Sequence, residues 1–227
     1  ENVDFRLRQS DFNSDDKRQG IPWLGIPVAD ISRADHFLIV GSFLRKDHPL
    51  LASRIRQAVK KGAQANIIHS VDDDLLMKVA NKAIVAPDAM VDLLTQVAQA
   101  LAAEKQTTLS GLPHVTVGAE AAAIAKSMSS GDRIAVLLGN FAQQHPQAAQ
   151  LQVLAQHIAA LSKGKFGFIG EAANSVGGYL AKAVPAANGL NAATMLANPR
   201  KAYVLLNVEA ELDCADPHQA LSALQSA

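Results

Sequence analysis

The stretch that decides the fold is HFLIVGSF at positions 36–43, which is followed by a helical pattern that ends at Gly62. Its apolar run stops at Gly41 and is too short for a buried helix, so it predicts a strand covered on both faces, as parallel sheets require. Pro49 suits the first helical position, where its missing N–H costs nothing, and Gly62 suits the position just past the end. A second apolar run at 65–68 completes a strand–helix–strand unit, whose crossover should be right-handed.

The same pattern recurs at positions 134–169, where IAVLLGNF is followed by a helical pattern and another apolar run. A repeat of this length predicts two related lobes. Because strands alternate with helices, we expect an α/β fold of two Rossmann-like lobes with mostly parallel sheets flanked by helices. The pattern breaks at 104–117, so the first lobe, with an irregular N-terminal segment, should span 1–105 and the second 106–227.

The remaining segments are predicted from periodicity and from turn residues. Residues 1–35 should be irregular, with a solvated charged run at 15–18. Helices are expected at 72–80, 88–103, 118–128, 171–182 and 191–196, short strands at 83–85 and 202–206, a loop at 207–215, and a final helix that opens at Asp216-Pro217 by the rule of a cap followed by proline.

The composition limits the classes of function. The 227 residues have a formal net charge of zero and 4% aromatic residues, so no basic, aromatic-rich surface for nucleic acid is expected. Cys214 is the only cysteine; it fits a reducing compartment and cannot by itself complete an iron–sulfur cluster or a structural zinc site. No apolar run approaches the roughly 18 residues that span a bilayer, so direct membrane insertion is not expected. The pattern starts at the first residues, which suggests a fragment of something longer.

The best candidate site lies where the two predicted strands end, at Gly41-Ser42 and Gly139-Asn140. Open α/β sheets bind ligands at the carboxyl ends of their strands, where the following helix N-terminus favours anions. Neither turn has the Gly-x-Gly-x-x-Gly spacing, and no Walker-type lysine follows. Two interpretations therefore stay open, a phosphate-binding turn and a plain tight turn.

Histidines and acids offer no complete metal site. His48 and His145 each precede a proline at a helix start, and a structural cap or packing role is favoured over a metal pair because equivalent positions in two lobes need not meet. The acids at 72–74 suit the positive end of a helix better than a cation site. No Gly-x-Ser-x-Gly motif supports nucleophilic hydrolysis. We therefore predict no catalytic residue and no metal.

Several segments resemble a known family. Residues 2–12 resemble the segment that leads into the nucleotide-fold part of molybdopterin oxidoreductases, and residues 40–49 with 54–62 resemble the strand–turn–helix of the same superfamily. More specifically, Leu44-Arg45, 174–177 and 191–192 are similar to the large iron–sulfur subunit of bacterial NADH-quinone oxidoreductase, respiratory complex I. The resemblance covers nearly the whole chain.

The resemblance implies a role in an assembly that passes electrons from NADH to quinone. The iron–sulfur clusters of such a subunit belong to an N-terminal part that a chain with only Cys214 cannot contain. Active members carry an Asp-Pro-Arg-like turn that helps to hold a pterin dinucleotide, and here that place has His69-Ser70-Val71. The resemblance thus implies a structural, cofactor-free segment. Its partners would be other peripheral-arm subunits of complex I, at the cytoplasmic face of the inner membrane.

Two other hypotheses stay open. The chain could be a fragment of an active molybdopterin-dependent oxidoreductase, in which Gly41, Ser42, Gly139 and Asn140 line a cleft for the pterin dinucleotide. An independent nucleotide-binding regulatory module is the third. If the cleft is vestigial, the same four residues are expected to serve backbone geometry only.

Overall fold

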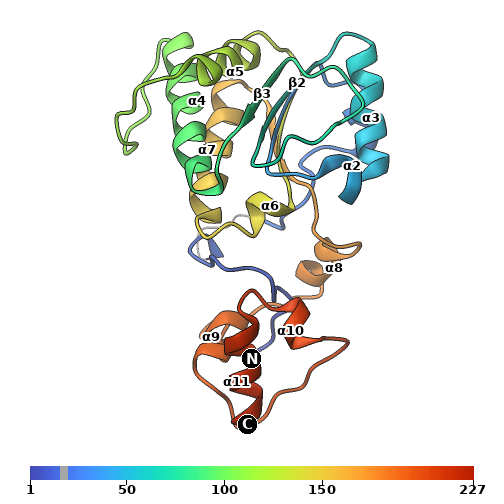
Figure 1. Ribbon diagram of the computed structural model, residues 1–227, viewed down its shortest axis with the longest axis vertical. Coiled ribbons are helices and arrows are strands. Elements are labelled where there is room, and N and C mark those ends of the chain that lie inside the picture. Colours follow the sequence, from blue (N-terminus) through green and yellow to red (C-terminus); the bar gives the residue numbers. More distant parts are fainter. Residues whose placement is uncertain (16–19) are drawn as a thin grey trace. The chain divides into compact units, whose positions relative to one another are not determined.

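The computed structural model describes residues 1–15 and 20–227, so positions 16–18 of the predicted charged run lie outside the described residues. The chain forms two compact units (Figure 1), which we call the sheet unit and the helical unit. The sheet unit comprises Pro22–Gln143 and Gln147–Glu171, and the helical unit comprises Glu1–Ile21, Gln144–Pro146 and Ala172–Ala227.

The sheet unit is built around one five-stranded sheet in which all neighbouring strands are parallel. The strand order is β3-β2-β1-β4-β5, which confirms the predicted α/β class. The strands are β1 (His36–Val40), β2 (Gln64–His69), β3 (Asn81–Ile84), β4 (Ile134–Leu138) and β5 (Lys165–Phe168).

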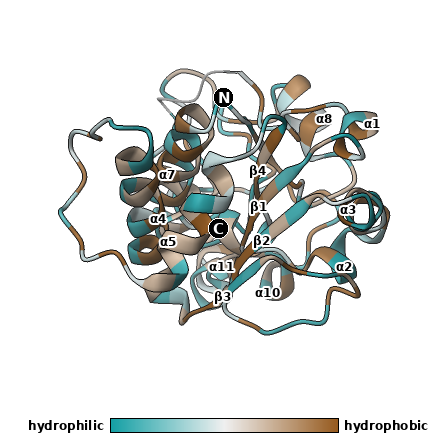
Figure 2. Ribbon diagram, turned by 90° about the horizontal axis from the view of Figure 1, so that it is seen from above, coloured by the Kyte–Doolittle hydropathy of each residue, from teal (hydrophilic) through white to brown (hydrophobic). Residues whose placement is uncertain are grey.

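Helices cover both faces of this sheet, as Figure 2 shows for α4, α5 and α7 on one side and α1 and α3 on the other. In chain order the helices of the sheet unit are α1 (Val28–Ile31), α2 (Leu44–Asp47), α3 (Pro49–Lys60), the 3-10 turn η2 (Pro87–Ala89), α4 (Met90–Glu104), α5 (Ala119–Ser129), α6 (Asn140–Gln143) and α7 (Ala148–Leu161). None of the helices in the described ranges is long and apolar enough to cross a membrane.

Alternate residues of the central strand belong to two hydrophobic clusters. Leu38 and Val40 pack into the cluster formed with α4, α5 and α7, whereas Phe37 and Ile39 pack into the cluster formed with α1 and α3. All residues of β1 and of β4 are buried. Their continuous apolar sequence therefore follows from cover on both faces, as predicted.

The division of the chain differs from the two lobes expected at 1–105 and 106–227. The first strands of the two repeats, β1 and β4, pair with each other in parallel register, from His36 opposite Ile134 to Val40 opposite Leu138. Each repeat alone would leave a row of unpaired backbone groups along its first strand, and pairing β1 with β4 satisfies both rows. The segment between α4 and α5 is accordingly a loop within one unit.

Within its described residues, the helical unit contains four short helices and the N-terminal segment. Arg6 holds this segment through ion pairs of 2.7 Å with Asp4 and with Asp15. The N–H of Ala215 donates to the carbonyl oxygen of Leu7 at 2.9 Å, so the two ends of the chain are joined within this unit. The helices are α8 (Ser175–Leu180), α9 (Ala192–Ala197), α10 (Ala210–Asp213) and α11 (Pro217–Gln225).

Two of the predicted elements do not form. Residues 72–80 are irregular instead of helical. Asp74 accepts a hydrogen bond from the N–H of Leu76 at 2.8 Å, and Leu76 has a φ of 53°; this local turn competes with a helix, as short acidic side chains often do. Residues 202–206 form no ladder with another strand of the described chain, and α10 lies in the expected loop at 207–215.

The helices α3, α4, α5 and α11 are confirmed within one or two residues, whereas the helix expected at 171–182 begins four residues later, as α8. Pro49 opens α3 and Pro217 opens α11. The side chain of Asp216 accepts a hydrogen bond from the N–H of Gln219, so the predicted cap of the last helix is present.

Candidate functional site

The predicted site residues lie at the carboxyl ends of β1 and β4. Gly41 follows β1 and Gly139 follows β4. Because the chain continues from β1 to β2 on one side and from β4 to β5 on the other, the sheet reverses its direction of winding between these two strands. In open α/β sheets this switch point is where ligands bind.

Gly41 adopts a conformation that other residues rarely adopt, with a φ of +58°. Its N–H donates to the carbonyl oxygen of Ile68 at 2.8 Å, and its own carbonyl accepts from the N–H of Ala142 at 3.3 Å. A Cβ at this position would lie 2.6 Å from the nitrogen of Ala142. The turn thus requires glycine for its φ and for the close approach of α6.

Gly139 requires glycine for space alone. A Cβ here would lie 2.3 Å from the Cβ of Ser42 and 2.4 Å from the carbonyl oxygen of Gly41. The N–H of Gly139 donates to the carbonyl oxygen of Val40 at 2.9 Å. The two predicted turns are therefore in direct contact, and the space between them does not admit even a methyl group on Gly139.

Three rings lie together along the same edge of the sheet, by which we mean the edge formed by the carboxyl ends of the strands. Phe43 follows the β1 turn, His69 ends β2, and Phe141 lies in α6. The ring centroids are 4.5 Å apart for Phe43 and His69, 5.4 Å for His69 and Phe141, and 6.4 Å for the two phenylalanines. We call these side chains the three-ring cluster. His69 is 3% exposed within it, so these rings occupy the edge of the sheet where a ligand would be expected.

The hydrogen bonds of His69 fix its tautomer when it is neutral. The backbone N–H of Val71 donates to Nδ1 at 2.9 Å, so Nδ1 carries no hydrogen and Nε2 carries one. Burial lowers the pKa of His69, and the carboxylates of Asp73 and Asp47 oppose this only in part. At neutral pH the ring is therefore uncharged and presents an Nε2–H donor that has no partner among the described residues.

Several other polar atoms on this edge have no hydrogen-bond partner in the described part of the chain. Ser42, 7% exposed, has an unpartnered Oγ. The side chain of Asn140 donates to Asp47 at 3.3 Å, but its Oδ1 accepts nothing there. Buried polar groups normally have partners in the protein or in ordered water. The unpartnered atoms on this edge are Oγ of Ser42, Nε of Arg45, Nε2 of His48, Nε2 of His69, Oδ2 of Asp73 and Oδ1 of Asn140.

The histidines and acids that the structure describes do not assemble into a metal centre. Within residues 1–15 and 20–227, no three His, Cys, Asp or Glu side chains are grouped so that they could hold a metal ion. His48 holds the N-cap position of α3, but its side chain makes no capping hydrogen bond, so of the predicted cap or packing role the side-chain cap is wrong for this residue. Burial lowers its pKa, with Asp47 opposing. Asp72 instead pairs with Lys82 at 2.6 Å.

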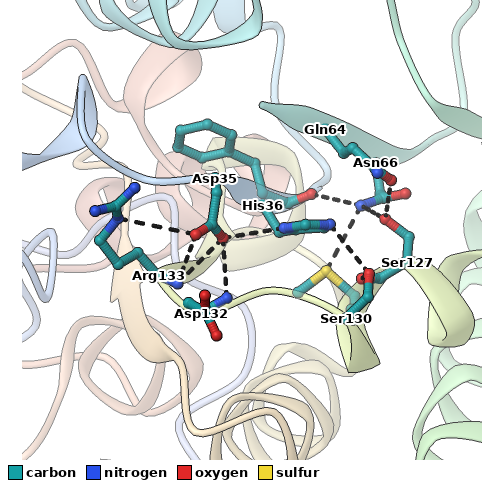
Figure 3. A network of polar contacts seen from close by, with 10 residues as sticks. Asp35, His36, Gln64, Asn66, Ser127, Ser130, Asp132 and Arg133 are labelled. Atoms are coloured by element: carbon teal, nitrogen blue, oxygen red, sulfur yellow. Dashed lines mark hydrogen bonds and ion pairs between the residues drawn. The ribbon is translucent and has the colours of Figure 1, made fainter. Parts of the chain in front are cut away.

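A polar network that the sequence did not reveal lies toward the opposite edge of the sheet, which is formed by the amino ends of the strands (Figure 3). Asn66 of β2 is fully buried and donates to the carbonyl oxygen of Phe37 at 2.9 Å and to Oγ of Ser127 at 3.0 Å. Its Oδ1 accepts from Asn81 of β3 at 2.6 Å. Ser127 in turn donates to Gln64 at 2.9 Å. This network joins three strands to α5, and every partner is a group of the protein.

Next to it, Asp35 links the start of β1 to the residues just before β4. Its carboxylate accepts hydrogen bonds from the N–H of Asp132 and of Arg133, and it lies 3.0 Å from Nδ1 of His36. Burial alone would raise the pKa of Asp35, but the hydrogen bonds from His36 and from these two N–H groups lower it. The contacts hold strand ends in register, and we assign them a structural role.

A family model described as Molybdopterin oxidoreductase matches residues 1–227. The chain belongs to the molybdopterin oxidoreductase family. The superfamily resemblance of residues 2–12 and 40–49 is thereby confirmed.

No curated protein sequence matches the chain. Among solved structures, the chain is similar to one in the formyltransferase/hydrolase complex from Methylorubrum extorquens, solved in complex with methylofuran, with 17% sequence identity and a TM-score of 0.46. The match covers 69% of this chain and 41% of that one, so the chain spans less than half of the length of this structural neighbour.

The family implies a pterin dinucleotide, and the residues present do not fit it in this arrangement. The turns of β1 and β4 touch each other at Gly139 and Ser42. The hydroxyl of Ser42, which would serve as a phosphate ligand, is buried. The three-ring cluster lies along the edge of the sheet that the dinucleotide would occupy.

Proposed function

We propose that this chain is a structural, cofactor-free segment of the large iron–sulfur subunit in the peripheral arm of NADH-quinone oxidoreductase, the complex that passes electrons from NADH to quinone. The observation that carries the proposal is the closed switch point, where Gly139 contacts Ser42 and the three-ring cluster covers the edge. A family member that binds no cofactor can use this edge for packing.

The backbone of the first turn supports the cofactor-free interpretation. The N–H and the carbonyl of Gly41 are both used inside the sheet unit, by Ile68 and by Ala142. A phosphate-binding turn needs N–H groups that point toward the ligand. In this turn the glycine instead fastens β1 to the neighbouring strand and to α6.

The turn after β2 supports it as well. Where active family members carry an Asp-Pro-Arg-like turn, the chain has His69-Ser70-Val71. His69 is buried and neutral at pH 7, and no arginine stands at the third position to meet a phosphate. The chemistry that would hold an anionic dinucleotide is therefore weakened at this place.

Two of the three segments that carry the resemblance to the large subunit of complex I, 174–177 and 191–192, lie in the helical unit and have structural roles there. A Cβ on Gly177 would lie 2.1 Å from Oδ1 of Asn174, so this glycine lets α8 approach the asparagine that precedes it. Asn191 caps α9 by accepting a hydrogen bond from the N–H of Thr194 at 2.9 Å. These motif residues build the fold, as a structural segment requires.

The proposal is tested on the native assembly. The native polypeptide is tagged and isolated with its partners, and the preparation is assayed for NADH-to-quinone turnover and for molybdenum and pterin content. We expect turnover to copurify with the tag and molybdenum and pterin to be absent. A tagged chain that is isolated without NADH-to-quinone turnover would refute the assignment to the complex. Stoichiometric pterin in the preparation would refute the cofactor-free interpretation.

The alternative is a fragment of an active molybdopterin-dependent oxidoreductase. It is favoured by the unpartnered Oγ of Ser42, Nε2–H of His69 and Oδ1 of Asn140 on one edge of the sheet. In that case Ser42→Ala should reduce the activity of the assembly strongly and leave its thermal stability unchanged. In the structural interpretation the same variant leaves turnover nearly unchanged, because the hydroxyl it removes has no hydrogen-bond partner among the described residues and holds no ligand.

A further inference from the structure

A third copy of the strand–turn–helix pattern lies in the helical unit. In each copy a glycine or asparagine turn is followed by a helix of four residues, a proline and a longer helix. The turn residues of the first and third copies, Gly41 and Asn207, have nearly the same left-handed φ, +58° and +54°. The short and long helices are α2 and α3 in the first copy, α6 and α7 in the second, and α10 and α11 in the third.

The strand of the third copy differs from the other two in its surroundings. β1 and β4 are each paired on both sides and buried along their whole length. Residues 202–206 hold the equivalent place before Asn207, yet Val204 is 98% exposed, Leu205 46% and Leu206 88%. In the described part of the chain, no strand pairs with them.

The described part of the helical unit also has no core of large buried side chains. Both hydrophobic clusters of the described residues belong to the sheet unit. The apolar residues that are buried in the described part of the helical unit are alanines: Ala192, Ala210, Ala220 and Ala223. Large apolar side chains on α8 and α10, such as Leu180 and Leu212, stay exposed at 65% and 68%. Where exposed apolar side chains gather, they are typical of an interaction site.

We propose that residues 202–206 are a strand of a second parallel sheet, and that their partner is an apolar strand of the same polypeptide that follows α11. The first two copies show how such a partner is supplied. α3 ends at Lys60 and β2 begins at Gln64, parallel to β1. α7 ends at Leu161 and β5 begins at Lys165, parallel to β4.

The exposed side chains define the chemistry of the partner. Neighbouring residues of a strand point to opposite faces, so Val204 and Leu206 share one face and Leu205 lies on the other. Both faces are apolar, which is typical of a parallel sheet covered on both sides by helices. The partner strand is therefore apolar along its length and brings helical cover with it.

Amide hydrogen exchange tests the pairing directly. Exchange at Val204, Leu205 and Leu206 is compared between the 227-residue chain and the longer native polypeptide that contains it. In the shorter chain these amides should exchange at the rate of an unstructured peptide. In the longer polypeptide they should be slowed by at least about a hundredfold, since paired core strands open only rarely.

A matched pair of variants separates pairing from general damage. Leu206→Asp should lower the urea midpoint of the longer polypeptide by about 1 M and leave that of the shorter chain unchanged. Leu50→Asp is the control, because Leu50 on α3 is 83% exposed in the sheet unit and belongs to no unpaired strand. It should affect neither protein.

Three results would overturn the proposal. Equal exchange at residues 202–206 in both proteins would show that the strand stays unpaired. Protection that appears only after another subunit is added would assign the partner to a different chain. Protection that rises with the concentration of the shorter chain would assign it to a second copy.

Discussion

Two glycines at the residue scale control how closely the turns of β1 and β4 approach each other. Gly41 combines a positive φ with a close contact, and Gly139 has the close contact only. Gly62 has a φ of +103° but open space, because a Cβ added to it would have no atom within 4 Å. An alanine at Gly62 thus tests backbone strain alone, one at Gly139 tests steric overlap alone, and one at Gly41 tests both. Comparing the stability of the three variants measures the structural role of the turns.

Gly62→Ala should lower the free energy of unfolding by about 1 kcal/mol, because alanine resists the left-handed conformation. Gly139→Ala should cost about 1–3 kcal/mol through overpacking, and Gly41→Ala should cost more than Gly62→Ala because both effects act there. Urea unfolding of the three variants measures these differences. Equal losses at Gly41 and Gly62 would contradict the close contact with α6.

His69 predicts a pH dependence of stability. Its pKa in the folded chain lies below the ordinary value of 6.5, so the unfolded chain binds the proton first as the pH falls. The contribution is therefore fully present above about pH 6.5 and is lost as the pH falls below that value. Asparagine keeps an acceptor for the N–H of Val71 and does not titrate, so His69→Asn should flatten the fall in stability between about pH 7 and about pH 5.

The control for this experiment is His114→Asn, since His114 is exposed. Part of the slope should remain in His69→Asn, because burial also lowers the pKa of His48. A slope that does not change in His69→Asn, or that changes equally in His114→Asn, would contradict the buried neutral imidazole.

For single residues, the sequence predicted the place in the fold better than it predicted the neighbouring side chains. Glycine after an apolar run is a strong signal, and Gly41-Ser42 and Gly139-Asn140 do lie at the carboxyl ends of neighbouring strands. The contact between the turns was not predictable, because it depends on the pairing of strands that are far apart in the sequence. The three-ring cluster was missed for the same reason: Phe43, His69 and Phe141 come from three separate places in the chain.

Among the elements, β2 depends on a single buried amide. Asn66 uses its Nδ2 and its Oδ1 to join β1, β3 and α5. Asn66→Ala should lower the free energy of unfolding by about 2–4 kcal/mol, because it removes these bonds and leaves the amide of Asn81 and the hydroxyl of Ser127 with fewer partners. Ser127→Ala removes one of these bonds and the bond from Ser127 to Gln64, and should cost less, about 1–2 kcal/mol. Thermal unfolding of both variants checks the order, and a larger loss in Ser127→Ala would refute it.

Local signals determined most elements, and the two failures have identifiable causes. The helix at 72–80 was predicted from three acids that suit a helix start, but Asp74 closes a turn of its own with Leu76. Residues 202–206 have the composition of a buried strand, but a strand forms only when it has a partner. Sequence periodicity reports what a segment can bury and not whether the partner is present.

For the whole molecule, the sheet unit holds both hydrophobic clusters. We therefore expect residues 22–171 to fold without the rest of the chain. The fragment should unfold cooperatively, with near-ultraviolet circular dichroism of packed aromatic side chains. A fragment that shows helical far-ultraviolet signal without cooperative unfolding would contradict this expectation, because it would mean that the helical unit is needed for the packing of the sheet.

The division into units was the least predictable feature of the fold. The repeat in the sequence indicated two equivalent halves, and the pairing of β1 with β4 shows that these halves share one sheet. A repeat gives the number of similar units, but the way in which they join depends on which strand edges remain open. Which strand edges remain open is determined by backbone pairing between strands that are far apart in the sequence.

The pairing of β1 with β4 also gives the sheet unit an approximate twofold symmetry. From β1 the chain winds to one side and places α3 on one face, and from β4 it winds to the other side and places α7 on the opposite face. The axis runs between the two strands and emerges where Gly41 meets Gly139. Substitutions at two symmetry-related positions usually act independently, but here the two turns touch, since a Cβ at Gly139 would meet Ser42 and the carbonyl oxygen of Gly41 itself. The double variant Gly41→Ala/Gly139→Ala should therefore lose less stability than the sum of its single variants, by about 0.5 kcal/mol or more, because the displacement of the turns that relieves one substitution also makes room for the other.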